Sequence, residues 1–555
     1  MRMCRCTLAM FLVLLTLGCG MARASAQESP QRITLLVMAD LHAQLNTHPE
    51  LFWDGKTSWI EPAGGLARVA GYVEALRKDN PTQTLFIDLG DTFQGSGPAS
   101  LSEGFSVVEP MNALKPDMAL PGNWEVAYGA EGMLKLAKAL DYPIIAANVY
   151  DQKTKALVFP PYIMMDLGGV RVAVIGYTDP DVPERQPPSY SMGLDYAGPE
   201  VIAPCVQAVR KKGADVVILA THVGLIKAVQ LARDIEGLDI VLSGDTHERT
   251  LQPIEVGKAW VVEPGAFGSF LGRLDLTIQN AALVERHFRL ITLTEGSFPE
   301  DAQVKEAVSL ALAPFAERMG KVLGKTTVPL YRYGVLETAL DAVITDAMRE
   351  AAHTEIALSN GFRFGPVIEA GPVKAEDMWA ALPNPEPLKV GKVYGRQLKA
   401  FLEEEIEQVF SRDPKQLFGG WLPRFSGMSV TFEAFAKRGE HIKEILVNGK
   451  PLEEGRLYSV VSCQREGDGP DVLCRIPEAL ETQVLGVDIH QALEAYLKHH
   501  DPLEPPRDNR MIAVDLPPVV RSQYEAIVGA GALGSHRPLA GLDVFKEGQQ
   551  NAAGG

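Results

Sequence analysis

The chain has 555 residues, of which 46% are hydrophobic and 22% are charged, and its formal net charge at pH 7 is −17. A chain of this length and composition can bury large apolar cores, so we expect two domains or more. The excess of acidic residues argues against nucleic acid or an anionic membrane surface as a partner.

Residues 1–26 have the pattern of a targeting segment. Arg2 and Arg5 precede a short apolar run, and an Ala-Ser-Ala sequence ending at Ala26 matches a cleavage site for export. We therefore expect a periplasmic protein whose signal peptide is cleaved near Ala26. A lipoprotein anchored at Cys19 is the alternative, although the residues before Cys19 fit that pattern poorly. No later stretch is long and apolar enough to predict a membrane span.

The cysteines beyond this segment are Cys205, Cys463 and Cys474. So few cysteines indicate that the fold does not depend on a framework of disulfides. Cys463 and Cys474 could still pair in an oxidising compartment. Cys205 lies in a helical pattern, and we expect it to be buried and unreactive.

From residue 30 to 295, β-branched runs alternate with amphipathic helical patterns such as the one at 64–78. This alternation predicts an α/β domain in which helices cover sandwiched sheets. The predicted strands lie at 33–39, 84–90, 143–149, 170–178, 214–222 and 239–244. Polar residues gather where these apolar runs end, and strand ends are where such folds place ligands and catalytic groups.

A helical stretch at 301–320, within a linker at 296–324, leads to a second predicted domain at 325–516. This second domain has mixed α/β patterning, with helices expected at 337–353 and 395–410 and strands at 428–435 and 456–463. Residues 517–555 are rich in glycine, alanine and polar groups, so we expect a loosely held tail.

The strongest chemical signal is a set of polar residues at successive strand ends. Imidazole, carboxylate and amide groups together are ligands for divalent first-row ions, and two ions can share one carboxylate. The candidate ligands, in chain order, are Asp40, His42, Asp91, Asn123, His222, Asp245 and His247.

These motifs resemble the calcineurin-like metallophosphoesterases in their two-domain 5'-nucleotidase arrangement. The resemblance implies one metal ion held by Asp40, His42, Asp91 and His247, and a second held by Asp91, Asn123, His222 and Asp245, with Asp91 shared. Relatives usually have histidine at the position of Asp245. A carboxylate there makes the site richer in oxygen, which favours manganese over zinc. Alternatively, Asp245 only caps a turn and one ion binds weakly.

Residues 122–129 read GNWEVAYG, whereas the nucleotidase motif is close to GNHEFDYG. Its histidine and aspartate stabilise the transferring phosphoryl group and its alkoxide leaving group. Trp124 and Ala127 stand at these two positions here. A thiolate, with a pKa of about 8.5, leaves without the help that an alkoxide needs. The motif therefore predicts a sulfur leaving group, with Trp124 as a pocket wall and N–H donor. Trp124 could otherwise simply fill space between the domains.

A narrower resemblance is to the SoxB thiosulfohydrolases. It rests on the GNWE sequence and on segments 90–97, 359–366, 419–427 and 462–475. It implies a dimanganese hydrolase, with zinc as the other possible metal, in which a hydroxide bridging the two ions attacks the substrate. The reaction releases sulfate from a cysteine S-sulfonate on the C-terminal arm of a SoxYZ-type carrier protein. We expect a monomer that has this carrier as its partner.

The second domain is expected to bind the anionic end of the substrate. Asn360 and Arg363 resemble the anion-binding residues of nucleotidases in type, and a guanidinium fork suits sulfonate oxygens. Trp421 could line the channel or pack between domains. Arg424 and Arg465 are further candidates, but surface salt bridges explain them better. The predicted catalytic residues are Asn123, Trp124 and Arg363, and the predicted substrate contacts are Trp124, Asn360, Arg363 and Trp421.

Two alternative functions fit the same sequence. One is a periplasmic 5'-nucleotidase or cyclic phosphodiesterase, which shares the metal chemistry and differs in the leaving group. The other is a binding protein without catalysis on the same scaffold, since the changes at 124, 127 and 245 would permit lost activity. Measuring the bound metal distinguishes the binding protein from the two enzymes, because a pure binding protein need not retain two tightly held ions.

Overall fold

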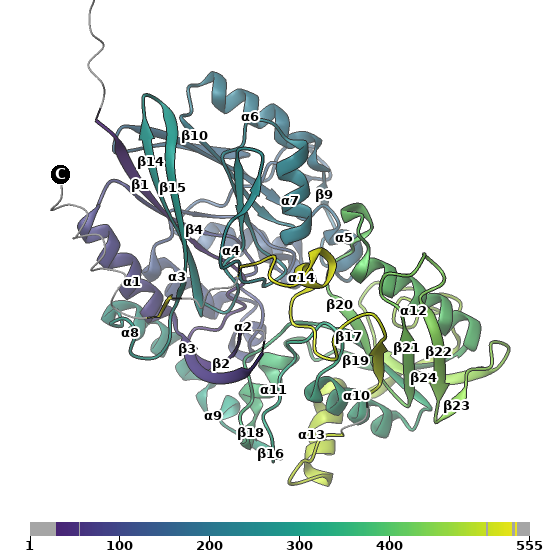
Figure 1. Ribbon diagram of the computed structural model, residues 1–555. Coiled ribbons are helices and arrows are strands. Elements are labelled where there is room, and N and C mark those ends of the chain that lie inside the picture. The colour runs from purple at the N-terminus through teal and green to yellow at the C-terminus, as the bar shows by residue number, and fades with distance from the viewer. Residues whose placement is uncertain (1–28, 55, 507–508, 535–538, 541–555) are drawn as a thin grey trace, which may run out of the picture.

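A computed structural model describes residues 29–54, 56–506, 509–534 and 539–540 (Figure 1). The predicted signal peptide, with Cys19 and Ala26, and most of the predicted tail beyond 534 lie outside these residues. Within the described part of the chain, no helix combines the length and the apolar character needed to cross a membrane.

The first domain is built around two six-stranded sheets, seen on the upper left of Figure 1. The first sheet has the order β27 (Leu539–Ala540), β15 (Ala282–Thr292), β14 (Phe270–Gln279), β1 (Gln31–Met38), β4 (Thr84–Asp88) and β5 (Met118–Ala119). The second has the order β12 (Ile254–Val256), β13 (Ala259–Val262), β11 (Ile240–Ser243), β10 (Val216–His222), β8 (Val170–Thr178) and β7 (Tyr162–Leu167).

The central strands β1, β4, β8, β10 and β11 are buried on both faces, which explains their nearly continuous apolar sequences. Alternate side chains of a strand point to opposite faces. In β1, Leu35 and Val37 therefore face the core between the sheets, while Leu36 and Met38 face the helices. The helices over the first sheet are α1 (Leu66–Asp79), α3 (Phe105–Leu114), α4 (Gly129–Ala139) and α8 (Ala302–Leu312), and those over the second are α6 (Ile202–Lys211) and α7 (Leu225–Asp234). The predicted sandwich of sheets covered by helices is confirmed.

The parallel strands of both sheets bring their carboxyl ends together. In the first sheet β1 pairs in parallel with β4 and β4 with β5, and in the second β10 pairs in parallel with β8 and β11. The residues that follow these strands therefore meet at one edge of the sandwich. This edge faces the second domain and carries the candidate site.

One predicted strand, 143–149, is wrong for most of its length. Only Val149 belongs to a strand, β6 (Val149–Asp151). The N–H of Ile145 donates to the carbonyl of Ala119 at 2.9 Å, whereas the N–H of Ala147 donates to the carbonyl of Gly176 at 2.8 Å. Since Ala119 and Gly176 lie in different sheets, the segment crosses between them and cannot continue either ladder.

The helices and strands predicted after residue 300 lie close to those of the structure. The linker contains α8, the 3-10 turn η3 (Ala313–Phe315) and α9 (Ala316–Met319). The second domain has a five-stranded sheet of β20 (Trp421–Ser426), β17 (Ile356–Gly361), β24 (Leu457–Cys463), β19 (Pro387–Tyr394) and β25 (Leu480–Asp488). Helices α10 (Ala339–Ala352), α11 (Ala375–Ala381) and α13 (Ile489–His499) pack in one core, and α12 (Gly395–Phe410) packs in another with β21 (Met428–Phe432) and β22 (Ile442–Val447).

The segment at 520–534 packs against both domains, although the sequence analysis placed it in a loosely held tail. Its helix α14 (Gln523–Val528) is the yellow helix between the domains in Figure 1. Tyr524 and Leu533 are buried in the core of the first domain, and Val520 is buried in that of the second. The apolar residues of this segment are too few and too widely spaced to reveal this packing in the sequence.

Candidate metal centre

Five of the predicted ligands converge in two overlapping groups. The first group is Asp40, His42 and His247, and the second is Asp40, Asp91 and His222, with the ligand atoms of each group within 4.8 Å of one another. His247 Nε2 lies 3.4 Å from Asp40 Oδ1, and His222 Nε2 lies 3.3 Å from Asp91 Oδ2. All five residues are buried. Asp40 belongs to both groups, whereas the sequence analysis assigned the shared role to Asp91.

The backbone around these residues is held in an unusual conformation. Asp40, His42, Asp91 and His247 have φ values of 52°, 46°, 55° and 55°, in the left-handed region that residues other than glycine rarely adopt. A cluster of such residues indicates that the fold stores strain at a functional site. The turns after the strands thus aim these side chains at a common point.

The GNWE sequence fixes the loop that carries Asp91. A Cβ atom at Gly122 would lie 2.2 Å from Asp91 Oδ1, so only glycine fits there. The N–H of Trp124 donates to Asp91 Oδ1 at 2.8 Å. The buried Glu125 carboxylate accepts from the N–H groups of Asp91 and Thr92 at 3.0 and 2.7 Å. Glycine and glutamate in this motif therefore position the carboxylate of Asp91.

Two histidines are oriented as ligands by backbone carbonyls. His42 Nδ1 lies 3.0 Å from the carbonyl of Gln94, and His222 Nδ1 lies 2.7 Å from the carbonyl of Leu89. A carbonyl can only accept, so each Nδ1 carries the proton and each Nε2 presents a lone pair. This is the second-shell arrangement found around metal-binding histidines.

The buried donor set fits divalent cations. In the described part of the chain, no group donates a hydrogen bond to Asp40 Oδ1 or makes one with His222 Nε2, although both atoms are buried. Burial raises the pKa of Asp40 well above its ordinary value, and burial followed by the neighbouring His42 lowers that of His247. Carboxylate oxygens and imidazole lone pairs facing one another at 3.3–3.7 Å repel unless a metal ion or a proton lies between them.

Asn123 also faces this centre. In the orientation that satisfies both of its polar atoms, the side-chain amide donates to Asp91 Oδ2 at 2.8 Å and accepts from Gln186 Nε2 at 3.0 Å. Asn123 is therefore held directly beside the Asp91 carboxylate.

Asp245 is beside this centre but faces another partner. Its Oδ1 and Oδ2 accept from the Arg185 guanidinium at 3.0 and 3.2 Å, and Asp245 belongs to neither converging group among the described residues. Burial raises the pKa of Asp245, but Arg185 and Arg363 outweigh burial, so the pKa lies below its ordinary value. The predicted ligand role of Asp245 therefore competes with an ion pair.

A cavity of about 100 Å³, here called the metal cavity, joins this centre to the second domain. The second domain contributes Asn360, Arg363 and Trp421 to its lining, and Trp124 lines it from the first domain. Arg363 is 8% exposed, its Nη2 donates to the carbonyl of Asp245 at 2.9 Å, and its buried Nη1 has no partner within the described chain. The geometry thus leaves a guanidinium donor available at the cavity.

Comparisons with known proteins agree with this architecture. Residues 33–249 match the calcineurin-like phosphoesterase family, and residues 322–469 match the 5'-nucleotidase C-terminal domain. The protein belongs to the two-domain metallophosphoesterases of the 5'-nucleotidase superfamily. A 5'-nucleotidase of Mus musculus is 25% identical to this metallophosphoesterase, over 81% of this chain and 85% of the relative.

Two solved structures from Thermus thermophilus share the fold of this metallophosphoesterase. One is described as the sulfate thiohydrolase SoxB in complex with glycerol, with a TM-score of 0.80, 24% identity and coverage of 88% of this chain and 98% of that one. The other is a 5'-nucleotidase precursor, with a TM-score of 0.77, 23% identity and coverage of 88% and 100%. At such identities, the likeness concerns the fold and does not choose between the two activities.

Aromatic side chains from both domains form one wall of the metal cavity. The Trp124 ring packs edge-on against Phe362 and Phe364, with centroids 5.6 and 5.2 Å apart. Trp421 lies deeper, 5% exposed, with its ring edge-on to Tyr333 and 5.1 Å from the Arg363 guanidinium. Trp421 therefore both lines the cavity and packs in the core.

Two predicted surface arginines are placed differently. Arg424 is fully buried, with its Nε 2.9 Å from Asp341, so the predicted surface salt bridge is wrong. Arg465 lines the metal cavity and donates to the carbonyls of Glu184 and Gln186 at 3.1 and 2.7 Å, without a carboxylate partner among the described residues. The sequence next to each arginine gives no indication of these partners, because they lie far away in the chain.

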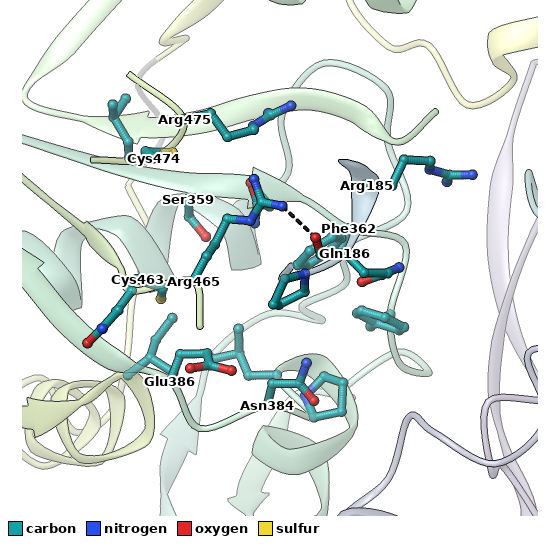
Figure 2. Close-up of a pocket in the computed structure, with 18 of the residues that line it drawn as sticks. Arg185, Gln186, Ser359, Phe362, Asn384, Glu386, Cys463, Arg465, Cys474 and Arg475 are labelled. Atoms are coloured by element: carbon teal, nitrogen blue, oxygen red, sulfur yellow. Dashed lines mark hydrogen bonds between the residues drawn. The ribbon is translucent and has the colours of Figure 1, made fainter. Parts of the chain in front are cut away.

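Arg185 and Gln186 also line the metal cavity, although they were not among the predicted site residues. They follow β8, whose carboxyl end lies at the same edge as the other site loops, so the strand-end rule could have found them. A second cavity of about 90 Å³ adjoins the first, and both residues also line it. Figure 2 shows this second cavity, with the hydrogen bond from Arg465 to the carbonyl of Gln186 as a dashed line.

The second cavity contains Cys463 and Cys474, and both are free thiols. The disulfide that the sequence allowed is therefore not formed in this structure. Burial raises the pKa of Cys474 to about 11, so its thiol stays protonated at neutral pH. Cys205 is half-buried in α6, and burial also raises its pKa.

Removing bound metal should destabilise the first domain. Ions that bind only the folded state stabilise it by about 4 kcal/mol at a thousand times their dissociation constant. Chelation should therefore lower the midpoint of thermal unfolding measured by calorimetry, and manganese should restore it. A midpoint that is the same before and after verified metal removal would show that the converging ligands hold no stabilising ion.

Proposed function

We propose that the protein hydrolyses a cysteine S-sulfonate on a SoxYZ-type carrier protein and releases sulfate. The reaction is R–S–SO₃⁻ + H₂O → R–SH + HSO₄⁻, so the bond between the two sulfur atoms breaks and the carrier keeps its sulfur. We further propose that it acts in the periplasm, as a monomer, after removal of residues 1–26.

The observation that carries this proposal is the environment of Trp124. Trp124 is the N-cap residue of the 3-10 turn η1 (Glu125–Tyr128), and the N–H of Ala127 within this turn donates to the carbonyl of Trp124 at 2.9 Å. Side chains three residues apart in such a turn lie on one side. The turn therefore presents an indole and a methyl group where relatives present an imidazole and a carboxylate. Neither group can donate a proton to an alkoxide.

A sulfur leaving group removes the need for that proton. A thiol has a pKa of about 8.5, many units below that of an alcohol, so a thiolate leaves as a stable anion. The apolar wall of Trp124, Phe362 and Phe364 also excludes water from the leaving group. Desolvation strengthens the remaining electrostatic contacts at the sulfonate oxygens.

The chain's own residues would divide the work at the cavity. Asp40, His42, Asp91, Asn123, His222 and His247 would hold two divalent ions, for which we propose manganese. Such ions supply an activated water at neutral pH and positive charge toward developing anions. Arg363 would hold the sulfonate through its unpaired Nη1, Asn360 and Trp421 would line its path, and Trp124 would bound the pocket.

A second candidate is a 5'-nucleotidase or cyclic phosphodiesterase. It is favoured by the names of curated relatives, such as the 5'-nucleotidase of Mus musculus. It requires the pocket to assist an alkoxide without the usual pair at 124 and 127. A binding protein without catalysis is less consistent with the converging ligands, since six predicted metal-binding side chains are retained around one point.

The proposal is tested by sulfate release from an S-sulfonated carrier arm or a matching S-sulfocysteine peptide. Manganese-loaded protein should release one sulfate per new thiol. In water enriched in ¹⁸O, one labelled oxygen should enter each sulfate, because water attacks the sulfonate sulfur. Release of thiol without sulfate, or sulfate lacking the label, would contradict hydrolysis at that atom.

Replacing Arg363 with lysine should slow sulfate release about 100-fold, because the flexible ammonium cannot reproduce the planar fork at the cavity. Steady-state rates at saturating peptide, with metal content measured in parallel, check this. Arg424→Lys is a comparison for general damage, since Arg424 is buried away from the cavity. If Arg363→Lys retains the full rate, Arg363 does not contact the reacting group.

A further inference from the structure

Arg185 lies on the wall of the metal cavity between two carboxylates. Its side chain is 8% exposed and forms ion pairs with Asp179 and Asp245. A guanidinium has five N–H donors, of which three are used in these contacts. No other acceptor among the described residues contacts it. Its Nε–H and one Nη2–H therefore remain for a ligand.

The second domain packs against the same guanidinium. A Cβ atom at Gly419 would lie 2.6 Å from Arg185 Cζ, so the glycine backbone packs directly against the guanidinium. Arg465 holds the carbonyls of Glu184 and Gln186, which flank Arg185 in the chain. The position of the guanidinium is thus defined by both domains at once.

The charges around Arg185 decide what it can contribute. The two negative charges of Asp179 and Asp245 outweigh its single positive charge, so it does not attract anions from a distance. A planar fork held by two carboxylates is preorganised, however, and loses little freedom when it donates to a ligand. Its contribution is therefore the orientation of a group already bound in the cavity.

Both carboxylate oxygens of Asp245 are engaged by this fork at 3.0 and 3.2 Å. Asp245 has a φ of 119°, so its backbone departs from the conformation shared by Asp40, Asp91 and His247. Its side chain is accordingly turned toward Arg185, outside the two converging ligand groups of the described chain.

We propose that Arg185 positions the tetrahedral oxyanion group of the substrate, and that Asp245 is the anchor of Arg185 and not a metal ligand. This inference rests on the proposed function only in requiring a sulfonate or phosphoryl group at the metal cavity. It makes Arg185 a specificity-determining residue that works beside Arg363.

A pair of glycine variants tests the position of Arg185 without changing any charge. Gly419 and Gly420 have φ values of 95° and 79°, so alanine is strained at both. Only at Gly419 does the new Cβ collide with Arg185, since nothing lies within 4 Å of it at Gly420. Gly419→Ala should raise KM about tenfold more than Gly420→Ala, with a smaller change in kcat.

Inorganic sulfate and phosphate, used as competitive inhibitors, provide a readout of the oxyanion site. Gly419→Ala should raise the inhibition constant by about the same factor as it raises KM. The factor should be the same for sulfate and phosphate if the site recognises only the tetrahedral shape of the anion. Equal KM and inhibition constants in the two alanine variants, with only thermal stability lowered, would overturn the proposal and leave Arg185 a structural ion pair.

The anchor role of Asp245 is tested by metal content. Asp245→Asn should keep the same number of tightly bound ions as the unmodified protein, measured by mass spectrometry after dialysis, while raising KM about tenfold. Arg185→Gln should raise KM by the same factor. The double variant should raise KM little further, because both single changes break the same ion pair between Arg185 and Asp245. Loss of one ion in Asp245→Asn alone would make Asp245 a ligand. If the enzyme cleaves AMP and not S-sulfonates, the same constants are measured with AMP, so the two proposals fail separately.

Discussion

Replacing Asp91 with alanine should remove most bound metal and lower hydrolysis at least about a thousandfold. Asp91 Oδ2 faces His42 and His222 at 3.7 and 3.3 Å, so its carboxylate contacts one histidine from each of the two groups of ligands. Metal ions contribute several kcal/mol to such reactions, and each 1.36 kcal/mol is about tenfold in rate. Metal per chain and the rate of sulfate release are measured on the same sample.

Asn123→Ala is the matched comparison for Asp91. Asn123 lies beside the Asp91 carboxylate and is the predicted ligand of one ion only, so its loss should weaken mainly that ion. Asp91→Asn tests charge alone, since the amide has nearly the same shape as the carboxylate. Two ions per chain in the Asp91→Ala protein would refute the assignment of Asp91 as a shared ligand.

Rebuilding the nucleotidase pair with Trp124→His and Ala127→Asp should raise phosphoester hydrolysis relative to sulfate release. The two positions lie three residues apart in one 3-10 turn, so both new side chains can face the leaving group. General acid assistance contributes about 10²- to 10⁴-fold for a poor leaving group and little for a thiolate. The ratio of kcat/KM for AMP to kcat/KM for the S-sulfonated peptide should rise at least about 100-fold.

The single change Trp124→Phe separates the two roles of the tryptophan. Phenylalanine keeps an aromatic wall against Phe362 and Phe364 but removes the indole N–H. A smaller loss of sulfate release in Trp124→Phe than in Trp124→Ala would assign Trp124 mainly to the wall. If the double variant leaves the ratio of the two activities unchanged, the missing pair does not explain the choice of leaving group.

The metal ligands could be predicted from the sequence because each of them lies at or just after the end of an apolar strand. Each of Asp40, Asp91 and His222 ends or follows an apolar strand, and parallel strands bring such ends to one edge. The helix at 395–410 was equally visible, since its apolar spacing spans the whole of α12. Local pattern and tertiary position agree in these elements.

Other features depend on partners that a local pattern does not contain. Arg185 acquires its place from Asp245, 60 residues away in the chain, and from Gly419 in the other domain. The burial of Arg424 depends on Asp341 in α10. The segment at 143–149 has an apolar sequence typical of a strand, but it bonds to two different sheets, and only Val149 lies in a strand.

The central claim is that this metallophosphoesterase hydrolyses at sulfur. It is tested most directly by giving one manganese-loaded sample a mixture of the S-sulfonated carrier arm and AMP at equal concentration and measuring released sulfate and phosphate together. The account predicts sulfate release at least about 100-fold faster than phosphate release, because no residue at 124 or 127 assists an alkoxide. Efficient phosphate release without detectable sulfate would contradict it and establish the nucleotidase activity instead.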